Sequence, residues 1–194
     1  MKFRQTWTAI RAMLILTVAL GIVYPLVVTG VGQLALPAQA NGSLVRVDGE
    51  IVGSTLIGQS FTDADGTAVP EWFQSRPSAA GDGYDGGASS GSNWGPENAD
   101  LIAAIQARRD AIESVDGTTD VPADALTASG SGLDPHISPA YARLQVAGVA
   151  EARGLSEREV SGLVESLIQQ RDLGYLGEPT VNVLQLNIAV AKLG

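Results

Sequence analysis

The side chains best suited to chemistry in this sequence are concentrated in thirteen positions, Thr127–Pro139, which we call the motif loop. It contains two glycines, three serines and the only histidine of the chain. Glycine permits backbone angles that are closed to other residues, and Ser138 is a typical N-cap for a helix that begins at Pro139. The loop could therefore hold an anion at a helix N-terminus, or bring hydroxyl, carboxylate and imidazole groups together. Its candidate functional residues are Thr127, Ser129, Gly130, Ser131, Gly132, Asp134, Pro135, His136 and Ser138.

Two kinds of role are open for the motif loop. A serine hydrolase would use Ser129 or Ser131 as the nucleophile. His136 would be its base, and Asp134 would orient the imidazole. However, the G-x-S-x-G elbow of many hydrolases is absent, and so is the phosphate-binding signature G-x-x-x-x-G-K-[ST]. The alternative is a rigid turn whose side chains accept hydrogen bonds from backbone N–H groups. We predict this second role, and hence no catalytic residue. Gly132 should adopt a backbone conformation that other residues resist, and Asp134 should fix His136 or the loop amides.

The composition excludes several other classes of site. The chain has 194 residues, no cysteine and one histidine, so disulfides, thiolate sites and the usual zinc ligand sets are excluded. Asp63–Gly66 is similar to the start of a calcium-binding loop, but no glutamate closes it at the required spacing. We therefore predict no metal site. The net charge of −9 excludes nucleic acid as a partner, because binding it needs a basic face.

The N-terminal region has the pattern of a membrane anchor. Residues 1–11 carry three basic side chains, and no charged residue occurs in residues 12–45. Residues 12–36 are apolar over more than the ~20 positions that a membrane-spanning helix needs. Basic residues before the span predict a cytoplasmic N-terminus and an external domain formed by residues 37–194. The alternative is a cleaved secretory signal ending at Ala40, but this apolar run exceeds the ~7–15 residues of such signals.

Four residues within the predicted span have special roles. Pro25 predicts a kink, because proline lacks the N–H that an inner helical turn needs. Thr29, Gly30 and Gly32 are small and would let another helix approach closely. A helix surrounded only by lipid has no need of such residues. We therefore expect the span to contact both membrane lipid and a second membrane protein.

The external domain is predicted to be of the α/β (α+β) class, with a mixed sheet and several helices. Residues 44–47 alternate in polarity and precede the turn pair Asp48–Gly49, which predicts a hairpin. The expected return strand contains Ile51, Val52, Leu56 and Ile57. Further strands are expected at Phe61 and in residues 71–75. Helices are expected over residues 98–113, 122–126, 139–153 and 156–171, and after Asn182.

A stretch rich in Gly, Ser and Pro, residues 76–96, separates the predicted strands from the helices. Its aromatic residues Tyr84 and Trp94 are unusual for a flexible linker. We therefore expect an ordered loop that packs on the domain or binds a partner. Arg76 is the one cation of this stretch, and we expect it to pair with an aspartate, for which Asp82, Asp85 and Asp134 are the candidates.

Taken in order, these motifs resemble those of the C subunit of Kdp-type potassium-transporting ATPases. The most specific piece is the run TASGSGLDPHISP of the motif loop. The other pieces are Tyr24-Pro25, Thr29-Gly30, Gly53-Ser54, Leu56–Gln59, Ser75–Ser78, Ser89–Asn93, Gly95-Pro96, Leu176–Pro179 and Val181–Leu184. They extend over nearly the whole chain. Within them, Arg76, Ser92, Asn93 and Asn182 form a second set of candidate site residues.

The resemblance implies a non-catalytic accessory subunit of a high-affinity, ATP-driven potassium importer in the cell membrane, which keeps one membrane helix. It implies two protein partners, the ATP-hydrolysing and the potassium-translocating subunits. It also implies a catalytic chaperone that assists assembly and raises the affinity of the ATP-hydrolysing subunit for ATP. Contact between ATP and this chain is implied by the resemblance alone.

The predicted topology places the motif loop outside the cell, away from cytoplasmic ATP. We therefore expect this chain to bind no cofactor itself, and to dock onto the potassium-translocating subunit near its outer entrance. A membrane-anchored external serine hydrolase and a binding module, secreted or anchored, are the alternatives.

Overall fold

The computed structural model describes residues 2–193, without the side chains of residues 2, 115 and 116. Met1 and Gly194, the outer ends of the predicted first and last segments, lie outside the described residues. The chain divides into two compact units between Val52 and Gly53. We describe each unit separately.

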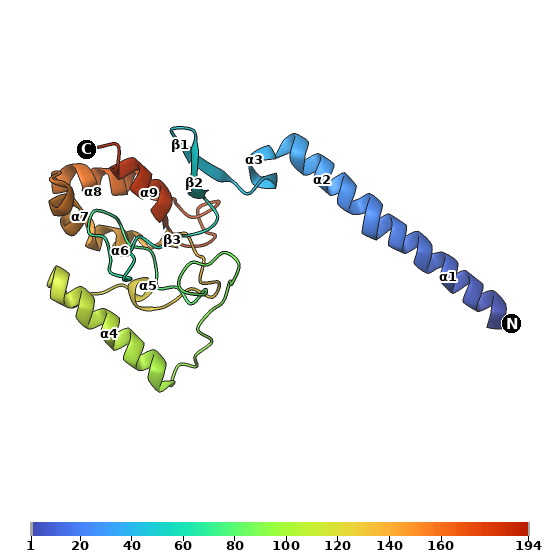
Figure 1. Cartoon of the computed structure of the whole chain (residues 1–194), viewed down its shortest axis with the longest axis horizontal. Helices are drawn as coiled ribbons and strands as arrows, with labels where there is room; N and C mark the ends of the chain where they lie inside the picture. Colours follow the sequence, from blue (N-terminus) through green and yellow to red (C-terminus); the bar gives the residue numbers. More distant parts are fainter. Residues whose placement is uncertain (1, 194) are drawn as a thin grey trace. The chain divides into compact units, whose positions relative to one another are not determined.

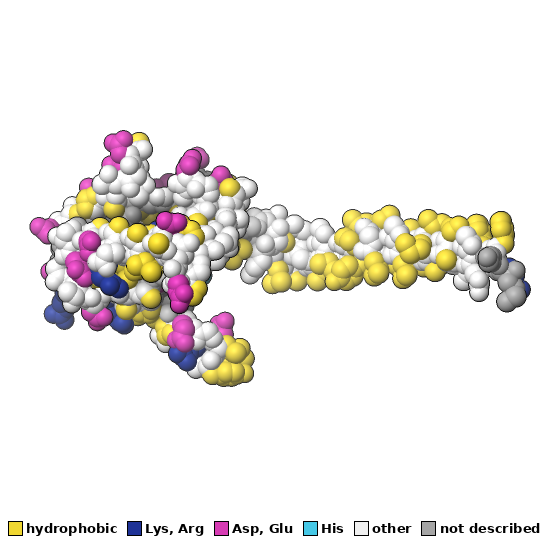
Figure 2. Space-filling model, turned by 90° about the horizontal axis from the view of Figure 1, so that it is seen from below, with side chains coloured by type: hydrophobic (Ala, Val, Ile, Leu, Met, Phe, Trp, Pro, Cys, Tyr) yellow, Lys and Arg dark blue, Asp and Glu magenta, His cyan; other side chains and the backbone are white. Residues whose placement is uncertain are grey.

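The first unit contains a long apolar helix. It comprises α1 (Lys2–Val18), a π-helical segment η1 (Ala19–Val23) and α2 (Tyr24–Ala35) (Figure 1). Phe3–Ala35 is long and apolar enough to cross a membrane. Figure 2 shows hydrophobic side chains along this helix, and none of its most apolar stretch is buried within the protein. The helix thus extends further toward the N-terminus than the predicted span 12–36, and its regular part ends one residue earlier.

Pro25 perturbs the helix in an identifiable way. It occupies the first turn of α2, directly after η1. The Tyr24 N–H donates to the Ala19 carbonyl, five residues back, rather than to the carbonyl four residues back. This wider turn is a usual response to proline, which has no N–H and whose ring collides with the carbonyl four residues earlier. After α2, Leu36 leaves the helical conformation, and a single turn, α3 (Pro37–Ala40), follows.

The predicted hairpin is confirmed. It consists of β1 (Leu44–Val47) and β2 (Glu50–Ser54). Asp48 and Gly49 join the strands with φ of +52° and +90°, the left-handed pair that a tight hairpin turn requires. The return strand is shorter than predicted, because Leu56 and Ile57 lie outside β2.

The second unit contains six α-helices within the described residues. They are α4 (Ala99–Asp116), α5 (Ala123–Leu126), α6 (Pro139–Leu144), α7 (Val146–Arg153), α8 (Glu157–Ser166) and α9 (Val183–Val190). The predicted N-cap at Ser138 is confirmed, and Asn98 and Asn182 likewise accept a backbone N–H of the helix that follows. Ser156 and Glu159 form a capping box at the start of α8.

Two helix predictions were wrong in extent. The helix expected over residues 139–153 is divided at Gln145 into α6 and α7. The helix expected to reach residue 171 ends at Ser166, because Gln169 forms an isolated bridge with Thr180 instead of continuing the helix.

The predicted mixed sheet is also wrong. Apart from the hairpin, the only sheet in the described part of the chain pairs β3 (His136–Ile137) with β4 (Val181–Asn182) in antiparallel register. The segments around Phe61 and over residues 71–75 are loops rather than strands. The Gln74 side-chain amide donates to the carbonyls of Phe61, Val69 and Trp72, and so provides hydrogen bonds that a neighbouring strand would otherwise supply.

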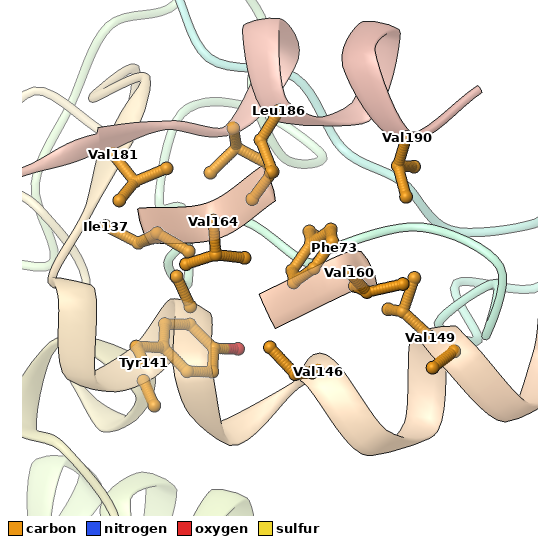
Figure 3. Packing of buried hydrophobic residues seen from close by; sticks show 14 residues of the cluster. Phe73, Ile137, Tyr141, Val146, Val149, Val160, Val164, Val181, Leu186 and Val190 are labelled. Carbon is orange, nitrogen blue, oxygen red and sulfur yellow. The ribbon is translucent and has the colours of Figure 1, made fainter. Parts of the chain in front are cut away.

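The hydrophobic core lies between α6, α7, α8 and α9, around the fully buried Phe73 (Figure 3). Figure 3 shows side chains from these elements converging on the Phe73 ring. Asn187 of α9 is buried beside it and brackets the Phe73 backbone, accepting its N–H at 2.9 Å and donating to its carbonyl at 3.0 Å. A residue from a loop is thereby fixed at the centre of a helical domain.

Helix α4 packs incompletely against the rest of the unit. Ile102 is apolar but 57% exposed. Arg108 is half-buried, and its Nη1 donates to the Leu126 carbonyl at 2.7 Å. The guanidinium therefore holds α4 against α5.

Candidate functional site: the motif loop

The polar side chains of the motif loop fold the loop itself. Ser129 Oγ accepts the Gly132 N–H at 2.9 Å, and Ser131 Oγ accepts the Leu133 N–H at 3.1 Å. The Asp134 carboxylate accepts the backbone N–H of His136 at 3.0 Å. These hydrogen bonds are the local turns that Ser and Asp typically form. The predicted turn, in which side chains accept hydrogen bonds from backbone N–H groups, is present in the structure.

At Gly132 the motif loop lies very close to the backbone of Ala80 and Ser90. Its φ is +67°, which other residues rarely adopt. A Cβ atom there would lie 2.5 Å from the Ser90 carbonyl oxygen and 2.7 Å from the Ala80 nitrogen. Ser78 Oγ donates to the Gly132 carbonyl at 2.6 Å and accepts the N–H groups of Ala80 and Tyr84. The predicted special backbone at Gly132 is confirmed, and no side chain fits there.

A second loop, residues 76–91, lies directly against the motif loop; we call it the bracing loop. The Ser131 carbonyl accepts the Ser89 hydroxyl at 2.9 Å and the Ser90 N–H at 3.0 Å. A Cβ at Gly91 would lie 2.9 Å from the Gly130 carbonyl oxygen. The expectation of an ordered loop in this stretch is therefore confirmed for its first part.

An ion pair joins the two loops. Arg76 Nη1 lies 3.1 Å from Asp134 Oδ2, and Arg76 Nη2 donates to the Thr127 carbonyl at 3.3 Å. Among the three aspartates proposed for Arg76, Asp134 is the one it contacts. His136 Nδ1 lies 3.5 Å from Asp134 Oδ1. Partial burial raises the pKa of Asp134, but the hydrogen bonds from His136 and the charges of Arg76 and His136 lower it more, so the net pKa lies below its ordinary value.

Tyr84 packs beside the Arg76–Asp134 ion pair. Its hydroxyl donates to the Arg76 carbonyl at 2.9 Å. Burial raises the pKa of Tyr84 to about 12, so the phenol stays neutral and remains a donor. Gly58 lies beneath the ring, where a Cβ would be 2.4 Å from Tyr84 Cε1. The Gly58 N–H donates to the Leu133 carbonyl at 2.9 Å, which attaches a third segment to the motif loop.

The end of the motif loop is fixed to two helices. Ser138 caps α6 by accepting the Tyr141 N–H, and it also donates its own N–H and hydroxyl to Asp124 of α5. The Pro135 carbonyl accepts the Val183 N–H at the start of α9. Asn182 pairs with His136 across the β3–β4 ladder.

The predicted site residues are therefore only partly brought together. Arg76 lies in the same network as the motif loop, and Asn182 is buried at its edge, where its side chain donates to the Thr55 carbonyl. Thr127 Oγ1 donates to Ala123 and completes α5. Within the described residues, the Asn93 side chain, at a backbone φ of +54°, donates only to the Gly91 carbonyl. Ser92 is half-buried.

The four predicted contact residues of the membrane helix belong to the other unit, and among the described residues only Gly32 is partly covered by this chain. Pro25, Thr29 and Gly30 are exposed, and a Cβ at Gly30 would meet no atom within 4 Å. At Gly32 a Cβ would only touch Ala40, at 3.7 Å. Apart from the contact of Gly32 with Ala40, no described residue of this chain covers the small-residue face.

Sequence reasoning missed three residues that hold the loop: Ser78, Tyr84 in its role beneath the ion pair, and Asp124. Ser78 stands in the Ser75–Ser78 piece of the resemblance, which was the available signal. Asp124 lies in the first turn of α5, where a carboxylate is common because it interacts favourably with the helix dipole. Its bond to Ser138, fourteen positions away, has no local signal.

The arrangement does not support nucleophilic chemistry. In the described part of the chain, both candidate serines are engaged with loop amides, and neither forms a hydrogen bond with His136. Ser129 is also buried. Among the described residues, no group of three or more His, Asp or Glu side chains could hold a metal ion. What remains is a loop whose polar groups maintain a fixed shape.

The sequence is similar to those of known potassium-transporting ATPase subunits. Residues 6–192 match the family model described as K+-transporting ATPase, c chain. The chain is 57% identical over 189 residues to the potassium-transporting ATPase KdpC subunit of Kineococcus radiotolerans, covering 96% of this chain and 93% of that protein. It is 54% identical to the KdpC subunit of Caulobacter vibrioides over 183 residues, covering 94% and 90%. The KdpC subunit of Mycobacterium tuberculosis is 51% identical over 193 residues, covering 98% and 99%.

Proposed function

Since this chain belongs to the KdpC family of potassium-transporting ATPase subunits, we propose that it is a single-pass accessory subunit that assembles with the ATP-hydrolysing and potassium-translocating subunits of a potassium importer. Residues 1–11 are cytoplasmic, residues 12–36 cross the membrane, and residues 37–194 form the external domain. The chain itself is non-catalytic.

The observation that carries this proposal is the combination of an uncovered membrane helix and an internally satisfied motif loop. The apolar stretch Phe3–Ala35 has no buried residues in its most apolar part, and Gly30 has open space around it. Small residues of this kind let membrane helices approach closely. The motif loop uses its serines and Asp134 to hold its own shape, so it presents a fixed surface rather than reactive groups.

The orientation rests on charge. Lys2, Arg4 and Arg11 precede the uncharged residues 12–45, and the next charged residue is Arg46. Cytoplasmic segments carry the excess of basic residues in membrane proteins. With the motif loop outside, direct contact with cytoplasmic ATP is excluded. We therefore assign any effect on ATP affinity to the assembled complex, and we place the docking of the external domain on the potassium-translocating subunit near its outer entrance.

The test is potassium-limited growth of a strain that lacks this subunit. A full-length copy restores growth, whereas residues 41–194 exported without the helix restore little, because tethering supplies a high effective concentration at the second contact. Gly30→Leu combined with Gly32→Leu weakens co-purification of the complex. The matched control is Val31→Leu, which lies in the same helix but does not remove a small residue. Full growth with the exported fragment would refute docking at two places.

The proposed effect on ATP needs its own measurement. The apparent affinity of the purified complex for ATP falls when this subunit is absent and recovers when it is added back. The isolated chain binds no ATP in equilibrium dialysis. Binding by the isolated chain would contradict an effect that acts only through assembly. A reporter fused to the C-terminus that is active in the cytoplasm would contradict the orientation.

A further inference from the structure

A hollow of about 810 Å³ lies between α4, the start of α7 and the loop formed by residues 60–84. This volume is within the range of small-molecule sites. Its walls are largely apolar, with Phe61, Val69, Trp72, Ile112 and Val149 among the lining residues. The rings of Phe61 and Trp72 are 6.3 Å apart and form one side of it. The hollow lies entirely within the second unit, and it borders the polar network of the motif loop through Arg76, Ser78 and Tyr84.

The charged residues that line this hollow are basic, whereas the net charge of the chain is negative. The protein has 21 acidic and 12 basic residues. Yet within the described part of the chain no Asp or Glu lines the hollow, while Arg76 and Arg108 both do. An apolar cavity with two guanidinium groups favours an anion and repels a cation. The hollow is therefore unsuited to potassium.

The two arginines are not equivalent. Arg76 is neutralised by Asp134 at 3.1 Å, although its buried Nε has no hydrogen-bond partner among the described residues. Arg108 donates to the Leu126 carbonyl, and no described carboxylate lies within 4.0 Å of it. Burial lowers the pKa of Arg108, as expected for a cation that is partly removed from water without a counter-charge. The hollow therefore carries one uncompensated positive charge.

We propose that this hollow binds an amphiphilic monoanion, a molecule with a single negative charge on an apolar body, with Arg108 receiving the charge and the Phe61–Trp72 wall receiving the apolar part. A carboxylate and a guanidinium form strong, charge-assisted hydrogen bonds. One uncompensated cation matches one negative charge, so a molecule with several phosphates fits poorly. A fatty acid and an anionic phospholipid both have the required chemistry. This site is independent of the proposed role in the potassium importer.

The test uses the full chain in nanodiscs, titrated calorimetrically, with empty nanodiscs as the blank. The probes are octanoate, octanol and octyltrimethylammonium, which share one tail and differ in charge. Octanoate binds at least about tenfold more tightly than the other two. Octanol carries no charge to pair with Arg108, and octyltrimethylammonium is repelled by it. Equal affinities for octanoate and octanol, or no binding of octanoate, would overturn the proposal.

Matched variants on α4 separate the hollow from the rest of the surface. Ala111 lines the hollow and is exposed, so Ala111→Glu keeps the helix and adds a negative charge at the rim. It weakens octanoate binding about tenfold or more. Ala103→Glu is the control, because this exposed residue lies eight positions earlier, roughly 12 Å along the helix. Equal effects of both variants would overturn the assignment.

A second pair of variants tests the cation. Arg108→Gln abolishes the preference for octanoate over octanol, whereas Arg109→Gln, which changes the neighbouring residue outside the lining, preserves it. Circular dichroism confirms that both variants are folded. Persistence of the preference in Arg108→Gln would refute the role of this residue.

The source of the ligand is decided by the nanodisc lipid. If phosphatidylglycerol in place of phosphatidylcholine weakens octanoate binding by competition, an anionic phospholipid is the occupant. If octanoate binds equally in both lipids, the occupant is a free carboxylate. Either result supports the site.

Discussion

Replacement of Gly132 by alanine tests whether the shape of the motif loop depends on the bracing loop. The φ of +67° costs a residue with a Cβ about 1–2 kcal/mol. The new Cβ would lie 2.5 Å from the Ser90 carbonyl oxygen and 2.7 Å from the Ala80 nitrogen. Both are backbone atoms, so the two loops must separate, at a cost of about 1–3 kcal/mol as in other overpacked sites. The expected loss is about 2–5 kcal/mol.

The same motif offers a control two residues away. Gly130 has no positive φ, and a Cβ there would meet nothing within 4 Å. Gly130→Ala should therefore leave stability unchanged, or raise it by up to about 1 kcal/mol by restricting the unfolded chain. Both substitutions remove one glycine from the same loop, so any difference between them reports the contact with Ser90 and Ala80.

Urea unfolding of the full chain in mild detergent, followed by tryptophan fluorescence, measures this difference. The midpoint should fall for Gly132→Ala at an unchanged m-value, since the surface exposed on unfolding is the same. A loss of this size is a large fraction of the ~5–15 kcal/mol that stabilises a typical domain. If the two variants differed by less than about 0.5 kcal/mol, the close approach at Gly132 would not be a determinant of the fold.

Five further substitutions, at Asp134, Asn187, Ser156 and Glu159, test other parts of the structure. Asp134→Ala should cost about 1–3 kcal/mol, because it leaves a backbone N–H and a guanidinium without their acceptor, and no hydrolytic activity should be lost in an ester assay. The pKa of Asp134 is lower in the folded than in the unfolded protein, so its contribution to stability is present above the unfolded pKa of ~3.9 and is lost as the pH falls through the folded value. Asp134→Asn should therefore flatten the loss of stability below about pH 4. An unchanged dependence of stability on acid pH would contradict this. Asn187→Leu should lower stability by about 2–5 kcal/mol, since it leaves the buried N–H and carbonyl of Phe73 unpaired; a thermal midpoint within one degree of the wild type would show that these bonds are replaced. Ser156→Ala should cost about 0.5–2 kcal/mol by removing the cap of α8, and Glu159→Gln, which keeps the capping geometry, should cost less.

The features that sequence could predict are those determined within a few residues. Asp48–Gly49 specifies a hairpin turn by its own backbone preferences, and Asn98 caps α4 through bonds to residues two and three positions later. Gly154 ends α7 at φ +65° for the same local reason. In each case the residue and its partner are neighbours, so the pattern is visible in the chain.

The features that sequence could not predict depend on partners far away. The β3–β4 pair joins His136 to Asn182, which are 46 positions apart, and it replaced the expected mixed sheet. The aromatic pair Trp72–Phe73 is typical of a strand, but Asn187, 114 positions away, binds the Phe73 backbone instead. The choice of Asp134 among three aspartates for Arg76 was likewise settled by the folding of two loops against each other.

The π-helical segment before Pro25 changes how the membrane helix must be interpreted. A π turn accommodates one residue more than an α turn, and each residue of an α-helix advances the side-chain direction by about 100°. Side chains of α1 and α2 that are seven or eleven positions apart across η1 therefore point in different directions, although they would nearly coincide on a regular helical wheel. A neighbouring helix that packs along the glycines of α2 would therefore contact a different face of α1 than a regular α-helical period predicts. Disulfide cross-linking scans along this segment should accordingly show their pattern shifting phase between Val18 and Tyr24.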